Sequence, residues 1–349
     1  MKPTANHTTR VHTLGIDLAK QTFSLHGVDA RGKPVWSKTV SRNKLLAHLQ
    51  QMSPCTIAME ACSGAHHWAR CVQTMGHTAR IMAPRFVAPY RKGGKNDGND
   101  AEAICEASTR PSMRFVPVKS ADQQAMLCLH RVRSALIKDR TAMLNQLRGL
   151  LSEFGIVMAK GRYPAQAALI EILDDEQNGI PPLARRLLRD VHQRLLMLNE
   201  QLLGYDRELE HHAKHCPHAQ RLMSIPGIGA VTATALIASI GDPGLFKNGR
   251  QFAAWLGLVP RQFTTGGVIR LGRITKQGDK YLRMLLIHGT RAVLATLKDK
   301  RDKLSQWTRA LIERRGYKRA TVALAAKNAR IVWAVLSHQT EYTARLAAS

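Results

Sequence analysis

Cysteine, aromatic residues and acidic residues are all scarce in this 349-residue chain, and long apolar runs are absent. The six cysteines form no CxxC pair and no regular spacing, which excludes a disulfide framework and indicates reduced, mostly buried thiols. No stretch approaches the ~18 consecutive apolar residues of a membrane span, so we expect no membrane partner. These absences favour a cytoplasmic protein.

The scarcity of acids leaves the chain strongly basic. It has 52 lysines and arginines against 25 acids, a formal net charge of +27. Such an excess resists self-association and favours a polyanionic partner, although a merely basic or ribosomal protein is the alternative. Residues 245–349 contain 21 of the cations and 5 of the acids. We therefore expect the richest nucleic-acid surface in the last third of the chain, while charge alone does not indicate an enzyme.

Hydrophobic periodicity divides the chain into three regions. Over 10–118, short apolar or alternating runs interleave with helical spacing, which predicts an α/β domain. Over 119–215, two long stretches with leucines three and four residues apart predict a helical hairpin, or a coiled coil that dimerises. After Cys216 and Pro217, residues 216–349 predict a mainly α-helical, glycine-punctuated domain.

Four acids are candidates for a metal site. Asp17 lies within an apolar strand-like run, Glu60 ends another, and Asp97 and Asp100 lie three apart at a predicted helix start. A carboxylate in an apolar strand is costly to bury without a cation. Two strand acids and a helical pair can supply the oxygens that two Mg²⁺ or Mn²⁺ ions about 4 Å apart require.

Simpler interpretations of these acids stay open. Asp97 could act only as the N-cap of its helix. Asp17 could pair with Lys20 or Arg31, and Glu102 or Glu106 could take the place of Glu60 as a metal ligand. The set of four, in this order and on these elements, is more specific than any one member.

Two segments of the last region predict contacts with nucleic acid. In the turn SIPGIG at 224–229, Gly227 and Gly229 let the backbone approach a phosphate, as in helix-hairpin-helix elements, and a turn that only packs is the alternative. The composition of the stretch 257–279 fits a flexible phosphate-facing loop with a hydroxyl nucleophile, although composition alone favours a turn whose threonines cap helices. Its assigned contacts are Gly266, Arg261, Arg270, Arg273 and Lys276.

A basic cluster and a histidine cluster complete the candidates. Arg314, Arg315, Lys318 and Arg319 surround one tyrosine and predict a further nucleic-acid contact, with a solvated loop as the alternative. His211, His212, His215, Cys216 and His218 match no zinc-finger spacing. The basic end of a helix is the better interpretation of that cluster.

Several motifs together resemble a known family. They are GIDLAK at 15–20, MEACSG at 59–64, KNDGNDAEAI at 95–104, SIPGIG at 224–229, FAAWLGLVPRQ at 252–262 and a TTGG…LGRITKQGD…LR stretch at 264–283. In this order they resemble the DEDD transposases of insertion sequences, of the IS110 type. The resemblance extends over nearly the whole chain.

The resemblance implies a fold and a mechanism. The first domain would be RuvC-like, of RNase H fold, with its metal-binding acids at Asp17, Glu60, Asp97 and Asp100. A coiled coil would link it to a second transposase domain. Members act as oligomers on two DNA duplexes, at the element ends and the target, and some are guided by a structured bridge RNA. A hydroxyl of the second domain attacks the phosphodiester and forms a covalent protein–DNA intermediate.

The chain departs from the family at that hydroxyl. The family nucleophile is a serine just before a glycine, and here Thr264 and Thr265 precede Gly266. By position Thr265 is the first candidate and Thr264 the second; the added methyl crowds in-line attack. Alternatives to a transposase are a DNA invertase of the same architecture, a junction-resolving nuclease without a covalent intermediate, and a non-catalytic nucleic-acid binder.

Overall fold

The computed structural model describes residues 10–94, 96–298 and 300–344, and its backbone divides into two compact units, Met1–Ala121 and Asp122–Ser349. Lys95, in the third motif, and the last five residues of the predicted C-terminal domain lie outside the described residues. Within the described part, no helix is both long and apolar enough to cross a bilayer.

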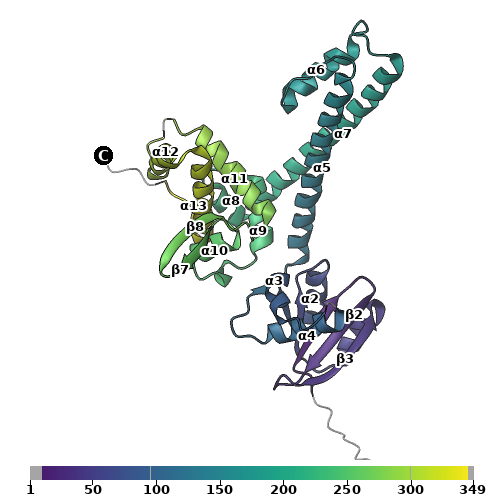
Figure 1. Ribbon diagram of the computed structural model, residues 1–349, viewed down its shortest axis with the longest axis vertical. Coiled ribbons are helices and arrows are strands. Elements are labelled where there is room, and N and C mark those ends of the chain that lie inside the picture. Colours follow the sequence, from purple (N-terminus) through teal and green to yellow (C-terminus); the bar gives the residue numbers. More distant parts are fainter. Residues whose placement is uncertain (1–9, 95, 299, 345–349) are drawn as a thin grey trace, which may run out of the picture. The chain divides into compact units, whose positions relative to one another are not determined.

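The first unit is a mixed α/β domain around a six-stranded sheet, as the sequence predicted (Figure 1). Its spatial strand order is β3-β2-β1-β4-β5-β6. Strands β1, β2 and β3 pair antiparallel, β4 and β5 run parallel to β1, and β6 is antiparallel to β5. The strands are β1 (Thr13–Leu18), β2 (Thr22–Val28), β3 (Pro34–Ser41), β4 (Thr56–Glu60), β5 (Thr78–Met82) and β6 (Phe115–Val116).

Helices cover both faces of this sheet. Leu14, Ile16, Ile57 and Met59 point to one face, where they form a core with α1 (Leu45–Gln50) and α2 (Ala65–Thr74). The alternate residues of β1 and β4 point to the other face, toward α4 (Asp97–Ser108). The short helix α3 (Pro84–Val87) packs beside α4 in a second, smaller core on this face.

A glycine decides how closely α4 approaches the sheet. A Cβ added to Gly15 would stand 2.3 Å from the carbonyl oxygen of Ala101 and 2.8 Å from the amide nitrogen of Cys105. Only a residue without a side chain allows this contact between β1 and α4. The glycine of the first motif therefore allows α4, which carries Asp100, to pack closely on β1, which carries Asp17.

The second unit contains two long helices, α5 (Ala121–Ser152) and α7 (Pro182–His215), with α6 (Arg162–Asp174) between them in sequence. Their distal parts share a core in which α6 also packs (Figure 1). Along α7, the buried leucines Leu188, Leu195, Leu202 and Leu209 recur every seven residues. This spacing keeps one side of a helix against a neighbour over its whole length.

The rest of the second unit is mainly helical, as predicted. Its helices are α8 (Pro217–Met223), α9 (Ala230–Ile240), α10 (Gly249–Trp255), α11 (Lys280–Ala295), α12 (Lys303–Arg315) and α13 (Tyr317–His338). One core joins α8 to α11 and α13, and a smaller one joins α11, α12 and α13. His130 of α5 is buried and connects the long helix to this bundle through hydrogen bonds with the hydroxyls of Thr234 and Tyr281, both 3.1 Å long.

Candidate active site

Three of the four predicted acids lie on one face of the first unit, at the carboxyl ends of two parallel strands. Gly15 and Asp17 alternate onto the α4 face of β1, and Ala58 and Glu60 onto the same face of β4. Ile16 pairs with Met59 in the parallel register, so Asp17 and Glu60 follow at the next position of neighbouring strands. Asp100 lies in the first turn of α4, next to the Ala101 that touches Gly15.

The electrostatics of Glu60 show that these acids are neighbours. Burial raises the pKa of Glu60 above its usual value, and the negative charges of Asp17 and Asp100 raise it further. The positive charge of Arg91 acts in the opposite direction and lowers that pKa. Like charges must be close to affect one another in this way.

Asp100 is already engaged by a cation. The Nε of Arg91 donates a hydrogen bond to its Oδ1, and the two side chains are 31% and 13% exposed. Carboxylate oxygens are the donors that hard divalent cations prefer, so the residue types fit Mg²⁺ or Mn²⁺. Within the described ranges, however, no three His, Cys, Asp or Glu side chains stand close enough to share one ion.

Asp97 differs from the other three acids. It is exposed, and it is absent from the charges that shift the pKa of Glu60. The interpretation of Asp97 as an N-cap is wrong, because the cap is Asn96, whose side chain accepts a 2.8 Å hydrogen bond from the amide of Asn99. Asp97 is the first residue of α4, where its negative charge interacts favourably with the positive end of the helix dipole.

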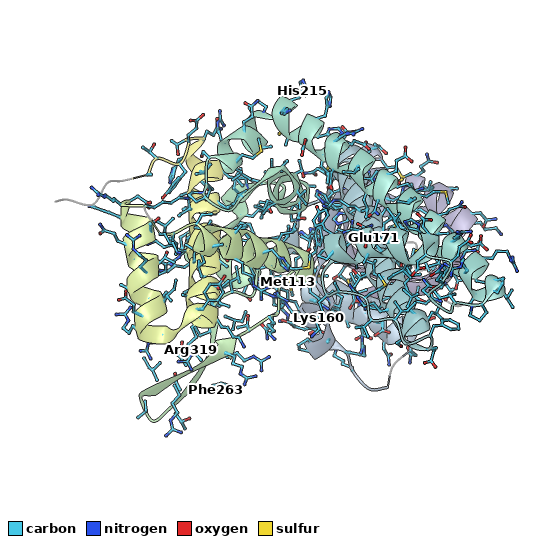
Figure 2. All side chains as sticks on the ribbon, turned by 90° about the horizontal axis from the view of Figure 1, so that it is seen from above. Met113, Lys160, Glu171, His215, Phe263 and Arg319 are labelled. Atoms are coloured by element: carbon cyan, nitrogen blue, oxygen red, sulfur yellow. The ribbon has the colours of Figure 1, made fainter. Side chains whose placement is uncertain are left out.

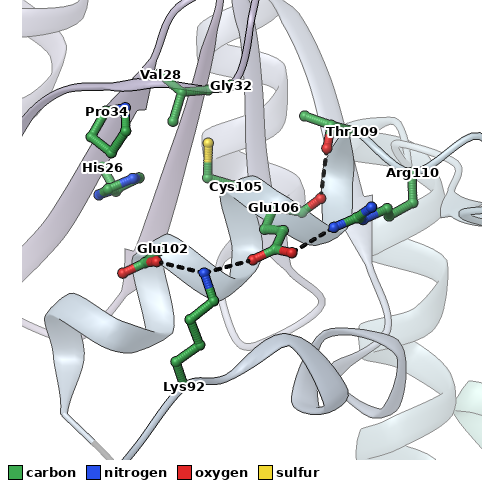
Figure 3. A pocket seen from close by; sticks show the side chains of 10 residues that line it. All are labelled: His26, Val28, Gly32, Pro34, Lys92, Glu102, Cys105, Glu106, Thr109 and Arg110. Atoms are coloured by element: carbon green, nitrogen blue, oxygen red, sulfur yellow. Dashed lines mark hydrogen bonds and ion pairs between the residues drawn. The ribbon is translucent and has the colours of Figure 1, made fainter.

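Glu102 and Glu106, the alternative ligands, belong to a separate cluster with Lys92 and Arg110 (Figure 3). Lys92 lies 3.3 Å from Glu102 and 3.4 Å from Glu106, and Glu106 also pairs with Arg110 at 2.5 Å. These residues line a cavity of about 370 Å³ together with His26 and Cys105. The charges of both glutamates are matched by Lys92 and Arg110 within this cluster.

The candidate nucleophiles lie on a two-stranded ribbon in the second unit. Strand β7 (Pro260–Thr265) pairs antiparallel with β8 (Val268–Ile274), and Gly266 and Gly267 form the turn with φ of 57° and 79°. Positive φ angles at both central residues are typical of the two-residue type I′ turn, which matches the twist of the paired strands and favours glycine. The flexible loop expected over this stretch is therefore a β-hairpin, and Thr264 and Thr265 lie in a strand and cap no helix.

The two threonines face opposite sides of this ribbon. Directly paired residues share a face, and successive residues alternate. Thr265 shares its face with Phe263, Val268 and Arg270, whereas Thr264 lies with Gln262, Ile269 and Leu271. Gln262 also donates a 2.9 Å hydrogen bond from Nε2 to the hydroxyl of Thr264.

The ribbon is exposed on both faces and carries no acid between Pro260 and Lys276. Phe263, Val268, Ile269 and Leu271 are 58–66% exposed, and Figure 2 shows the labelled Phe263 on the ribbon beyond the packed helices. The predicted contacts Arg261, Gly266, Arg270, Arg273 and Lys276 are all exposed as well.

A close backbone contact fixes the base of the ribbon. A Cβ on Gly278 would stand 1.9 Å from the carbonyl oxygen of Trp255. Nearby, the buried Arg283 donates from Nη1 to the carbonyl oxygens of Leu256 and Gly278, at 3.0 and 3.2 Å. Asp279 caps the following helix α11 through the amides of Tyr281 and Leu282.

The remaining predicted contacts have different environments. Gly229 is exposed, with open space where a Cβ would lie. Gly227 has a φ of 87° and packs so that a Cβ would stand 2.7 Å from the carbonyl oxygen of Gly289, so packing alone explains this glycine.

The exposed cations Arg314, Arg315, Lys318 and Arg319 surround the junction between α12 and α13. His211 and His215 lie ring to ring at 4.2 Å on the last turn of α7.

Comparison with known proteins finds two family models that match this chain. Residues 14–156 match the DEDD transposase model of the IS110 type, and residues 219–306 match the transposase IS116/IS110/IS902 family. A probable family 20 transposase of Pseudomonas aeruginosa is 49% identical over 330 residues, which cover 94% of this chain and 98% of the relative. The chain belongs to this transposase family.

Other relatives of this transposase are equally complete. The transposase of insertion sequence element IS1111A from Coxiella burnetii is 44% identical over 332 residues, covering 95% of this chain and 91% of the relative. The transposase of element IS1328 from Yersinia enterocolitica is 42% identical over 335 residues, covering 95% and 99%. The resemblance seen in the motifs is thereby confirmed, and the protein is a DNA transposase enzyme.

Sequence reasoning missed two residues of the transposase site region. Arg91 gave no signal, because a single cation nine residues before its partner belongs to no recognisable spacing. Arg283 was included only as the end of a motif, and its burial against backbone carbonyls depends on the tertiary fold.

Proposed function

We propose that this transposase cuts and rejoins DNA with a carboxylate site in its first unit and a threonine hydroxyl of the ribbon in its second. The observation that carries the proposal is the gathering of Asp17, Glu60 and Asp100 at the carboxyl ends of two parallel strands. These acids are far apart in the sequence, and their like charges repel one another in the folded protein. Stability alone does not require such a cluster, which is typical of a functional site.

The sheet supports an RNase H-like, RuvC-like fold for the first unit. Three antiparallel strands are followed by two strands parallel to β1, in the order β3-β2-β1-β4-β5. The family resemblance implies this fold, and the acids lie where β1 and β4 end.

In the carboxylate site, Asp17, Glu60, Asp97 and Asp100 would hold Mg²⁺ or Mn²⁺. A divalent cation there supplies charge stabilisation for the attacking and leaving oxygens of phosphoryl transfer. The protein supplies the geometry: β1 and β4 fix the first two acids, and α4 carries the other two at its N-terminus. Because Asp97 is exposed, we expect it to join the set only when a cation is bound.

In the ribbon, the Thr265 hydroxyl is the first candidate nucleophile and Thr264 the second. Attack of the hydroxyl oxygen on phosphorus forms a threonine–phosphate bond and breaks the bond to the leaving strand oxygen, which takes up a proton as the hydroxyl loses its own. Thr264 already accepts a hydrogen bond from Gln262, whereas Thr265 shares its face with Arg270, which favours Thr265.

The partners follow from the exposed cations. The ribbon and the α12–α13 junction both present exposed cations, and the ribbon contains no acid. Such positive charge suits contacts with the phosphates of the element ends and the target DNA. A two-stranded ribbon also has dimensions that the major groove of DNA admits. A bridge RNA guide, a homo-oligomer and an association with the bacterial nucleoid are further parts of this proposal, and they rest on the family resemblance.

The test is strand transfer on plasmid DNA that carries the element ends. We expect Asp17→Asn and Asp100→Asn to abolish joined products in Mg²⁺ and in Mn²⁺, while DNA binding stays within about threefold. Glu102→Gln, on the same helix but in the other cluster, is the matched control and should retain activity. Equal losses of activity and binding, or an active Asp100→Asn variant, would remove the catalytic assignment.

A further inference from the structure

The carboxylate cluster of the first unit contains acids that are neighbours and yet do not converge. Asp17 and Asp100 both act on the pKa of Glu60, but among the described residues no three donors can share one ion. The Nε of Arg91 donates a hydrogen bond to Oδ1 of Asp100, so a cation of the chain already occupies one oxygen of this cluster.

Arg91 is held in this position by the chain on either side of it. It follows the short turn η2 (Ala88–Tyr90), and its amide donates a 3.3 Å hydrogen bond to the carbonyl oxygen of Ala88. The next residue, Lys92, reaches the other side of α4 and contacts Glu102 and Glu106 (Figure 3). Two successive cations thus hold α4 from two sides, and only the first enters the carboxylate cluster.

A guanidinium and a divalent cation have the same electrostatic effect on Asp100. Each stabilises a largely buried carboxylate that would otherwise lie beside two other acids. Both cannot occupy the same oxygen, and a cation of charge +2 next to the guanidinium is repelled. The Arg91 guanidinium and a divalent cation would therefore compete for Asp100.

We propose that Arg91 is an internal counter-ion that holds Asp100 in the metal-free transposase and is exchanged for the divalent cation when the site is loaded. This inference rests on the proposed function, because it takes the cluster to be a metal site. It makes Arg91 a positioning residue: the guanidinium holds Asp100, and this carboxylate becomes available to a divalent cation only as the guanidinium leaves it.

The test measures Mn²⁺ binding to the full chain without DNA, by electron paramagnetic resonance of the free ion. Removing the competitor in Arg91→Ala should tighten Mn²⁺ binding about fivefold or more. It should also lower the melting temperature without metal and enlarge the rise in melting temperature that Mn²⁺ produces. Lys92→Ala, which removes the neighbouring cation outside the cluster, should leave Mn²⁺ affinity unchanged.

Two further variants keep the test decisive. Arg91→Gln retains a hydrogen-bond donor without the charge, so it should also bind Mn²⁺ more tightly if Arg91→Ala fails to fold. Arg91→Lys keeps the charge and should bind Mn²⁺ as weakly as the wild type. Unchanged or weaker Mn²⁺ binding in folded Arg91→Ala or Arg91→Gln would overturn the inference.

The same data separate this inference from the proposed function. If the wild type binds Mn²⁺, Asp100→Asn does not, and Arg91→Ala equals the wild type, then the metal site stands and the exchange fails. If neither the wild type nor the Arg91 variants take up Mn²⁺, both proposals fail. If Arg91→Ala binds Mn²⁺ more tightly than the wild type, and the double variant with Asp100→Asn loses this gain, both the metal site and the exchange are supported.

Discussion

Gly15 on β1 and Ala101 on α4 touch backbone to backbone, so closely that a Cβ on the glycine would lie 2.3 Å from the alanine carbonyl oxygen. This contact joins the first motif of the chain to the third. Each partner has an acid close by in sequence, Asp17 two residues after Gly15 and Asp100 immediately before Ala101. The geometry of the carboxylate site therefore depends on a position with no chemistry of its own.

The first prediction concerns this contact. Gly15→Ala should destabilise the protein by about 1–3 kcal/mol, because the added methyl meets backbone atoms that cannot rotate away. Because α4 must shift, strand transfer should fall even at temperatures where the variant is folded. Thermal melts and plasmid assays check both effects. Gly94→Ala, at a position open to space, is the control, and a fully active Gly15→Ala variant would contradict this account of the site.

The second prediction separates the two threonines. Thr265→Ala should abolish the protease-sensitive protein–DNA adduct, while Thr264→Ala should retain it, because the two hydroxyls lie on opposite faces of the ribbon. Thr265→Ser should retain the adduct and form it faster, since it lacks the methyl that crowds attack. Denaturing gels of end-labelled DNA measure the adduct. The reverse pattern would assign the reaction to Thr264.

The third prediction concerns the ribbon cations. DNA affinity should fall steeply with salt, because neutralised phosphates release their counterions. Arg261→Ala, Arg270→Ala and Arg273→Ala should each reduce the slope of log affinity against log salt, by about 0.9 for every phosphate that the variant no longer neutralises. Arg186→Ala, an exposed cation on α7, is the control. Unchanged slopes in all three ribbon variants would move the DNA surface elsewhere.

The fourth prediction is a pH dependence of stability in the second unit. Burial lowers the pKa of His130 to about 4 from its usual 6.5, so the folded unit favours the neutral imidazole. A lowered pKa means that this stability is present above pH 6.5 and is lost as the pH falls toward 4, by up to about 3 kcal/mol.

His130→Gln should reduce the loss of unfolding free energy between pH 6.5 and pH 4, although the variant is less stable than the wild type at pH 7. Urea titrations between pH 4 and 7.5 measure the difference. An identical loss in the variant and the wild type would show that other groups cause it.

Much of the first unit could be predicted from the sequence, for reasons tied to particular residues. The apolar strand that ends at Glu60 and the helical spacing of α4 mark these elements in the sequence, and the acids on them were recognised as candidates. The alternating residues between Val11 and Val28 continue without a marked break, whereas the structure divides them into two strands with a turn at Ala19–Gln21. Alternation alone does not show where a chain reverses.

The ribbon and the Arg91 contact could not be predicted, because their causes are tertiary. Over 257–279 the many glycines and cations hid the alternation of β7 and β8, and a ribbon exposed on both faces has no apolar side to mark it. Gly227 was assigned to a phosphate, and its contact with Gly289 depends on a helix about 60 residues away. The gathering of Asp17, Glu60 and Asp100 was anticipated, whereas the cation among them was not.

The most direct measurement is a crystal structure of the protein soaked in Mn²⁺, with diffraction recorded at the manganese absorption edge. We predict an anomalous peak bounded by carboxylate oxygens of Asp17, Glu60 and Asp100, with the Arg91 guanidinium withdrawn from Asp100. Manganese bound elsewhere, with these three side chains unmoved and the ion pair intact at saturating metal, would contradict the account.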